Sequence, residues 1–314
     1  MMKRNRSNQG AISPMAALVL VLILLGIVWA AGNLFPVKQD STLFPFGMFT
    51  GNLEKQTVDQ EQIRSLDGCD SIQIISTGTN VVASVSDSPE LKARFHGTFR
   101  SIVSGNEPVL EISIVQQKMI IEVKKMNGIL ALFDQNTQLD ICIPSSFTGD
   151  TEIGTVSGSI DADILTARQL KMHTVSGKIR VKSLKVKNDI KCTSVSGSIS
   201  LEAVSGNHVS VQTTSGSIQV LSLQVMGTDI RSVSGNIHVV LPSASGFKLQ
   251  ATSLSGRIDC DFDLADKIAE RGRLDGKTGD GNILIKLNTI SGNIRVNKET
   301  FSEKADPIRE EGSI

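Results

Sequence analysis

The chain has 314 residues, with 32 lysines and arginines against 32 aspartates and glutamates, and aromatic residues make up only 4% of it. The balanced charge gives no general reason for nucleic-acid binding, and the absence of tyrosine argues against aromatic platforms for base stacking or strong protein contacts. The length could hold two ordinary domains, although a repeat architecture can use it as one.

The N-terminus predicts a membrane anchor. Basic residues at 3, 4 and 6 precede an uncharged apolar run, Met15–Ala31, which with Ala11 and Ile12 reaches about 21 residues, enough to span a bilayer of about 30 Å. Positive charge on the short side predicts residues 1–10 in the cytoplasm, a single-pass signal anchor over 11–31, and an extracytoplasmic remainder. The alternative is a signal peptide cleaved after the small residue Ala30.

A stalk and a less regular β-region follow. Residues 32–64 carry proline, glycine and polar clusters, which indicate a linker. Strand-like segments then occur at 71–76, 80–85, 91–99, 109–114, 119–124 and 139–144. We expect this region to be continuous with the rest of one β-domain over 65–298, and the charged tail 299–314 to be disordered.

A Ser-Gly hexapeptide of the form TVSGSI recurs about every twenty residues. Its copies occupy 155–160, 174–179, 194–199, 213–218, 232–237, 253–258 and 289–294. The corner glycines are Gly158, Gly177, Gly197, Gly216, Gly235, Gly256 and Gly292, and Gly281 is aligned with them as an eighth copy. A fixed period of this size is typical of stacked repeats.

Each copy predicts a strand, a tight corner and a second strand. After the glycine, the second and fourth residues are apolar and the third is polar in seven of eight copies, as in Ile179, Arg180 and Val181. We expect glycine to supply a positive φ at the corner, and the serine before it to form a stacked hydroxyl ladder. Since one unit cannot bury its own apolar face, the fold class predicted is all-β, a single-stack β-solenoid of the β-helix or β-roll type.

The spacing departs from the period near the C-terminus. Gly256 and Gly281 are 25 residues apart, and between them residues 263–273 have the apolar pattern of a short helix. We interpret this segment as an insertion or lateral cap, after which the last strands pair antiparallel rather than completing a rung.

No catalytic or metal-binding constellation is predicted. The four cysteines lack a CxxC pair and favour free buried thiols over disulfides. The four histidines fall at unrelated repeat positions, so we expect neither a metal nor a cofactor. The triple Asp259, Asp261 and Asp263, near Asp275 and Asp280, alternates along an expected strand and could bind calcium or act as acid and base, although a solvated face is favoured.

A basic run is the one candidate binding site. Eight lysines and arginines lie between Arg168 and Lys191, and Lys171, Lys178, Lys185 and Lys187 could contact an anionic polymer such as teichoic acid or lipid headgroups. The competing interpretation is a charge ladder, in which Asp161 stacks on Arg180 and Asp163, Lys182 and Glu202 share one column.

These features resemble a known family. The N-terminal span, the irregular strands ending in LDICIP (139–144) and the TVSGSI-like repeats are similar to the bacterial β-strand-repeat domain of unknown function labelled "putative adhesin", which includes LiaG-like membrane-anchored proteins of Gram-positive bacteria. The likeness covers roughly 65–298. It implies an envelope-facing β-solenoid and transfers no site residues.

The function favoured is therefore non-enzymatic: a membrane-anchored, extracytoplasmic β-solenoid that binds a cell-wall polymer or an envelope protein, in an adhesin-like or envelope-stress role. One alternative is a polymer-forming scaffold of the bactofilin type, whose columns join end to end. The other is a carbohydrate-active β-helix enzyme, which would need acidic and basic groups converging in one groove.

Overall fold

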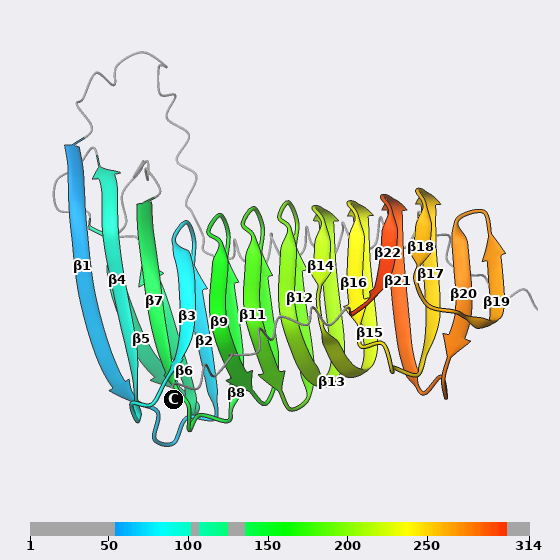
Figure 1. Cartoon of the computed structure of the whole chain (residues 1–314). Coiled ribbons are helices and arrows are strands. Elements are labelled where there is room, and N and C mark those ends of the chain that lie inside the picture. The colour runs from blue at the N-terminus through cyan, green and yellow to red at the C-terminus, as the bar shows by residue number, and fades with distance from the viewer. Residues whose placement is uncertain (1–53, 102–106, 125–135, 300–314) are drawn as a thin grey trace, which may run out of the picture. The chain divides into compact units, whose positions relative to one another are not determined.

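The computed structural model describes residues 54–101, 107–124 and 136–299, which form 22 strands and no helix (Figure 1). The N-terminal strands are β1 (Glu54–Ser65), β2 (Ser71–Ser76), β3 (Asn80–Ser86), β4 (Glu90–Ser101), β5 (Val109–Val115), β6 (Lys118–Lys124) and β7 (Asn136–Pro144). The repeat strands are β8 (Asp150–Thr155), β9 (Ile160–Ala167), β10 (Leu170–Thr174), β11 (Ile179–Val186), β12 (Asp189–Ser194), β13 (Ile199–Ser215), β14 (Ile218–Val220), β15 (Leu223–Ser234) and β16 (Ile237–Leu241). The C-terminal strands are β17 (Phe247–Ser255), β18 (Ile258–Cys260), β19 (Ala265–Glu270), β20 (Arg273–Thr278), β21 (Ile283–Ser291) and β22 (Ile294–Lys298).

The predicted membrane span 11–31 and the tail from 300 onward lie outside the described residues. Among the residues that are described, no helix has the length and apolar character needed to cross a bilayer. The predicted stalk, 32–64, reaches into β1, because that strand already begins at Glu54.

The repeats stack as parallel rungs, which confirms the all-β, solenoid-like prediction. In each rung an entry strand runs into the Ser-Gly corner and an exit strand leaves it; β10 and β12 are entry strands, for example, and β11 is an exit strand. The isoleucine after each corner is in register with the next, in the order Ile160, Ile179, Ile199, Ile218 and Ile237. This register follows from the constant period, because each residue pairs with the equivalent residue of the next repeat.

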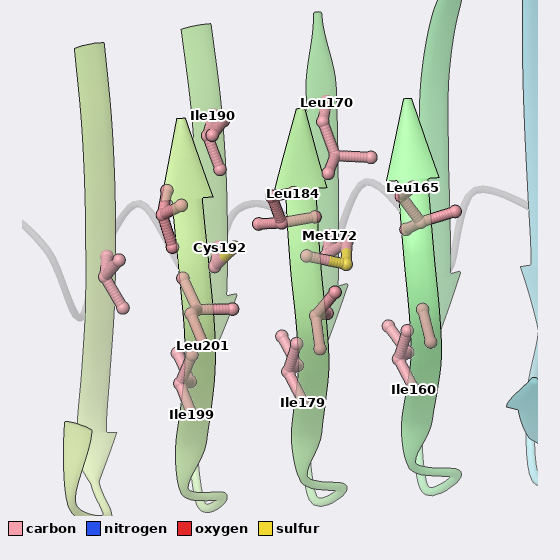
Figure 2. Packing of buried hydrophobic residues seen from close by; sticks show 14 of the residues in the cluster. Ile160, Leu165, Leu170, Met172, Ile179, Leu184, Ile190, Cys192, Ile199 and Leu201 are labelled. Atoms are coloured by element: carbon pink, nitrogen blue, oxygen red, sulfur yellow. The ribbon is translucent and has the colours of Figure 1, made fainter. Parts of the chain in front are cut away.

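The core lies between the entry and exit strands (Figure 2). Ile160, Ile179 and Ile199 are fully buried on the exit strands, and Met172 and Cys192 are buried opposite them on the entry strands. Inward residues alternate with outward polar ones along β10, Leu170–Thr174, as the period-two pattern predicts. Burial of each such side chain contributes about 1.5–3 kcal/mol, so the column is stabilised rung by rung.

Glycine is required at the corners for a steric reason that differs from the one predicted. None of the corner glycines lies in the left-handed region; only Gly216 has a positive φ, 158°, which is close to extended. A Cβ added at Gly177 would instead lie closer than 3.0 Å to the carbonyl oxygen of Gly158 in the previous rung, and Gly197 meets Gly177 in the same way. The corners are therefore glycine because successive backbones touch there.

A buried hydroxyl ladder runs beside the corners, and it is formed by different residues from those expected. The serines that directly precede the glycines, such as Ser176, are exposed. The ladder uses the Ser or Thr three residues before each glycine: Thr174 Oγ1 donates to the Gly158 carbonyl at 3.1 Å and accepts from the Gly177 N–H at 3.0 Å. The same donation to a glycine carbonyl is made by Ser194, Thr213, Ser232, Thr289 and Ser253.

The last rung does not follow chain order. β21 pairs in parallel with both β15 and β17, and β22 pairs with both β16 and β18, so the C-terminal rung lies between two earlier ones. Gly281 is consequently no corner: it precedes the entry strand β21, where Ile283 pairs with Phe247. The alignment of Gly281 with the corner glycines was wrong because the DGNI sequence imitates the repeat over only four residues.

The segment 263–273 is also not helical. It contains β19, which pairs antiparallel with β20, and β20 pairs antiparallel with β17 (Figure 1). The prediction of an insertion is thus confirmed, but the segment extends the sheet beyond β17 as a hairpin and contains no helix. The expected antiparallel pairing of the last strands was wrong, because β21 and β22 pair in parallel. Phe262 closes this end of the core, with its ring at 87° to that of Phe247 and the ring centroids 4.9 Å apart.

The N-terminal region joins the stack by mixed pairing. β2 and β3 pair in parallel with β8 and β9 and continue the rungs, whereas β4 is antiparallel to both β7 and β1. Phe95 and Phe99 of β4 are each 1% exposed and fill the core here, where no Ser-Gly corner occurs.

Candidate binding surface

The four lysines singled out in the sequence do not gather on one surface. Lys171 projects from the entry strand β10, and Lys185 projects from the exit strand β11. Lys178 lies in a Ser-Gly corner, and Lys187 lies in the return turn after β11, at the opposite end of the strands. All four are exposed, so each is available to solvent.

The predicted charge ladder accounts for Arg180 and Lys182, and Arg168 is paired in a similar way. Arg180 pairs with Asp161 in the preceding rung at 2.5 Å, and Lys182 pairs with Asp163 at 2.7 Å. Arg168 pairs with Asp150 at 2.8 Å, which holds the pKa of that carboxyl below its usual value. Each of these cations is matched by an acid one rung back, so the ladder interpretation is confirmed for them.

Lys171 forms no such ion pair, although an acid lies opposite it one rung back. Its register partners are Glu152 on one side and Lys191 on the other, and within the described residues neither lysine forms an ion pair. Like charges directly opposite each other in a sheet are destabilising. Lys171 and Lys191 therefore concentrate positive charge on the entry face, beside the smaller polar residues Thr193 and Ser210.

His173 borders these lysines and is exposed, although part of its ring is covered by the preceding rung. Its ring lies against the backbone of Gly154 in the preceding rung, where an added Cβ would lie closer than 3.0 Å to the ring. Burial lowers the pKa of His173, so the neutral imidazole is favoured at neutral pH. It therefore contributes a flat polar surface rather than a further charge.

The acidic residues singled out in the sequence do not share one ligand site, because most of them bond to separate neighbouring side chains. Only Asp259 belongs to β18, which ends at Cys260; it accepts from Arg257 at 2.7 Å, and Asp261 accepts from Asn297 at 2.6 Å. Asp275 pairs with Arg273, and Asp280 accepts from Asn282. In the described part of the chain, no group of three or more potential ligands is placed to hold a metal ion.

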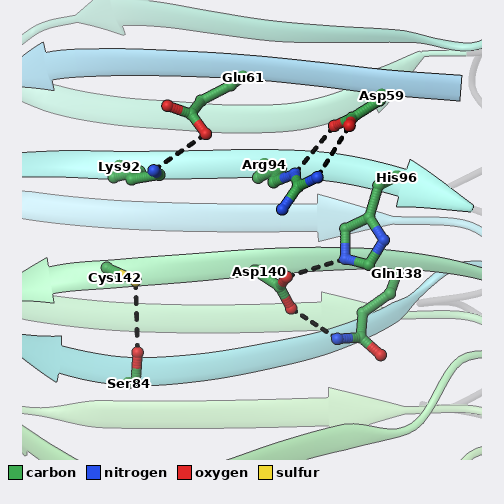
Figure 3. A network of polar contacts seen from close by, with 9 residues as sticks. All are labelled: Asp59, Glu61, Ser84, Lys92, Arg94, His96, Gln138, Asp140 and Cys142. Carbon is green, nitrogen blue, oxygen red and sulfur yellow. Dashed lines mark hydrogen bonds and ion pairs between the residues drawn. The ribbon is translucent and has the colours of Figure 1, made fainter.

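A polar network that the sequence analysis missed covers the outer face of β1, β4 and β7 (Figure 3). His96 Nε2 and Asp140 Oδ2 are 2.8 Å apart, and Gln138 donates to the other oxygen of Asp140 at 2.6 Å. Arg94 donates two bonds of 2.8 Å to Asp59, which holds the pKa of that carboxyl below its usual value. Period-two polar residues in 92–96 and 138–142 were the available signal, but only tertiary pairing brings these two segments together.

This network is not arranged for nucleophilic catalysis. Cys142 lies on the same face, but it is opposite Lys92, whereas His96 is opposite Gln138. Four residues along a strand correspond to about 13 Å, so the imidazole cannot activate that thiol. The nearest polar partner of Cys142 is Ser84, whose Oγ lies 3.5 Å from Sγ.

The cysteines are free, as predicted, although only Cys192 is fully buried. Burial raises the pKa of Cys192 to about 12 and also raises that of Cys69. Cys69 lines a cleft of about 390 Å³ together with Asp67, Asp70 and Arg168. Because its thiol is held protonated, this cleft offers no activated nucleophile.

Comparison with known proteins places the repeat region in one family. A family model described as Toastrack DUF4097 matches residues 69–297. A comparison with curated proteins found no match.

Solved bacterial structures are also similar. A "putative adhesin" from Bacteroides fragilis is 12% identical, with a TM-score of 0.49, over 79% of this chain and 99% of that one. A "putative cell adhesion protein" from Clostridium sporogenes is 15% identical, with a TM-score of 0.39, over 78% and 100%. A "Putative lipid binding protein" from Parabacteroides distasonis is 16% identical, with a TM-score of 0.36, over 80% and 98%.

Proposed function

From the premise that this chain belongs to the Toastrack DUF4097 family, we propose that it is a non-enzymatic binding protein of the bacterial cell envelope. Its β-solenoid faces outward from the cell membrane, held there by residues 11–31, and binds an anionic envelope polymer. The apolar N-terminal run and the basic residues before it support the anchor and its orientation.

The observation that carries the binding proposal is the opposition of Lys171 and Lys191. Other charged residues of these rungs pair a base with an acid one rung away, as at Arg180 with Asp161 and Lys182 with Asp163. Lys171 and Lys191 differ from these pairs, because they are two bases in register on neighbouring entry strands. A polymer carrying phosphates would remove that repulsion by binding across both rungs.

The non-enzymatic proposal is supported by the charged groups of the described residues. Many of their acids and bases are paired along neighbouring strands, as in the network of Arg94 with Asp59. A polysaccharide-cleaving site would need a base and an acid facing one substrate position. The phenylalanines of the described residues are all buried, so none of them offers a stacking platform for sugars.

Binding is tested by comparing two double variants of equal charge change. Lys171→Glu/Lys191→Glu should weaken sedimentation of the full chain with teichoic-acid-bearing walls by at least tenfold at low salt. Lys178→Glu/Lys185→Glu should retain most of the binding, because those lysines lie at a corner and on the exit face. Equal loss of binding in both variants would show that only the net charge of the protein matters. No loss in either variant would refute the binding site on the entry strands.

Location is tested by protease treatment of intact cells, followed by immunoblotting for residues 71–297. The proposal requires digestion in intact cells and retention of the undigested protein in the membrane fraction. Protection until lysis would place the solenoid in the cytoplasm and would favour the scaffold alternative.

A further inference from the structure

The stack ends in four strand edges, and the described residues protect three of them. On the N-terminal side, the edge strand β5 is bonded by side chains from β1: Gln60 Nε2 donates to the Pro108 carbonyl at 3.0 Å and its Oε1 accepts from the Leu110 N–H at 2.7 Å. Gln62 donates to the Leu110 carbonyl at 2.6 Å. These amides occupy backbone groups that another strand would need.

The two C-terminal edges are protected by length and by irregularity. β18 has only three residues. β19 has a register shift between Ala265 and Ile268, and Asp266 has a φ of 52° and an ion pair with Lys277 at 2.7 Å. Bulges, short strands and charges are the devices by which edge strands avoid pairing.

The fourth edge, β1, is neither short nor irregular, and the charges that it carries, such as Lys55 and Glu61, are of both signs. Its twelve residues pair with β4 without a register shift, from Glu54 with Ser101 to Ser65 with Glu90. Among the described residues, no strand pairs with the other edge of β1, which lies at one end of the sheet in Figure 1. A long, regular, open edge in a molecule whose other edges are closed indicates a pairing partner.

We propose that the free edge of β1 pairs antiparallel with β1 of a second copy of this chain. A two-fold register centred on Val58 places Lys55 opposite Glu61 of the second copy, twice in the interface. Lys55 is exposed and forms no ion pair within the described residues, so it can supply the new contact. Centring on Thr57 would also place Lys55 opposite an acid, Asp59, but it pairs a shorter stretch of strand. Registers centred on Asp59 or Gln60 would oppose acid to acid.

This interface closes as a dimer and does not grow. Within the residues that the structure describes, each copy has one open edge, and the same edge is used by both partners, which is the isologous arrangement of two-fold dimers. Growth into a filament would need β1 to pair with β18 or β19 of another copy, and these edges are short or bulged. The proposal is independent of the ligand proposed above.

The test uses two variants that are each self-repelling. Lys55→Glu opposes two acids in its own homodimer. Glu61→Lys/Lys92→Glu opposes two lysines, while keeping in reversed form the ion pair of 2.9 Å that joins Lys92 to Glu61 within one chain. A mixture of the two variants restores an opposite-charge pair at both positions. Glu111→Lys/Lys124→Glu, which reverses the 2.8 Å pair between β5 and β6, is the matched control.

The mass of the detergent-solubilised full chain is measured by light scattering after size exclusion, for each protein alone and for the mixture. We expect a dimer for the wild type and the control, monomers for the two β1 variants, and a dimer for their mixture. Circular dichroism spectra identical to that of the wild type would show that the variants are folded. A wild-type monomer, or a dimer in either β1 variant alone, would overturn the proposal; the latter would also be the result of dimerisation through the N-terminal segment.

Discussion

The Ser-Gly rungs and the N-terminal region are kept in register by different contacts. In the rungs, backbones meet at the corner glycines, and a buried hydroxyl from each rung bonds the glycine carbonyl of its neighbour, as Thr174 bonds Gly158. In β1, β4 and β7, pairing is antiparallel, the core contains Phe95 and Phe99, and ion pairs such as Arg94 with Asp59 line the outside. In the repeat, register is thus specified because equivalent residues of successive rungs contact each other. In the irregular region, register depends on specific pairs of side chains.

The largest expected effect comes from breaking the apolar column of the rungs. Ile199 is 0% exposed, and Ile199→Asp would bury an unpaired carboxylate, so we expect a loss of more than about 4 kcal/mol in the free energy of unfolding, enough to unfold the rungs. Ser200→Asp on the outer face should change it by less than about 0.5 kcal/mol. Similar denaturation midpoints for the two variants would contradict the register.

The next effect separates the two reasons for a corner glycine. Gly177→Ala is expected to cost about 3 kcal/mol, because the new Cβ would meet the Gly158 carbonyl oxygen and the rungs would have to separate. Ser176→Ala, one residue earlier and exposed, is the control and should be nearly neutral. If φ rather than contact were decisive, an asparagine at position 177 would be tolerated much better than alanine in urea unfolding.

A smaller effect is expected from the hydroxyl ladder. Thr174→Val keeps the side-chain shape but leaves the Gly177 N–H without its acceptor, at a cost on the order of 2 kcal/mol. The same exchange at Thr193, which is half-buried on the outer side of the neighbouring strand β12, should cost much less. Equal unfolding free energies for the two variants would show that the ladder does not stabilise the rungs.

The smallest effect concerns the N-terminal network and depends on pH. The Arg94 guanidinium lowers the pKa of Asp59 below its ordinary value of 3.8, so the pair stabilises the fold above that value and the contribution is lost as the pH falls through the lowered pKa. Asp59→Asn should therefore lower the melting temperature slightly at neutral pH, and its difference from the wild type should disappear as the pH falls below 3.8 and through the lowered pKa of Asp59. A constant difference across the acid range would exclude this linkage.

The burial pattern and the register of the regular rungs could be predicted from local sequence because the repeat has a constant period. The inward placement of Ile160, Ile179 and Ile199 and the pairing of Asp161 with Arg180 follow from a constant spacing, and both are confirmed. The position of β21 between β15 and β17 could not be read in this way, because no local signal distinguishes a rung that ends the stack from one that enters it. The helical pattern expected in 263–273 likewise gave way to pairing with β20.

The candidate surface was predictable to a smaller extent. Lys171, Lys178, Lys185 and Lys187 were grouped because they are close in sequence, but the corner and the return turn send them to different faces. Lys191, twenty residues after Lys171, is the lysine that the stack places beside it. The network of His96 and Asp140 joins residues 44 apart in the chain, and only antiparallel pairing of β4 with β7 brings them within 2.8 Å.

The sequence by itself determined the family, the β-class and the register of the regular rungs, because period and alternation are local properties that repeat. Tertiary structure alone decided the order of the C-terminal rungs, the antiparallel N-terminal strands and, among the described strands, the open edge at β1. The reason is that strands pair so as to leave few backbone N–H and C=O groups unpaired. The number of unpaired groups depends on all the strands of the sheet together, so no single segment of the sequence determines it.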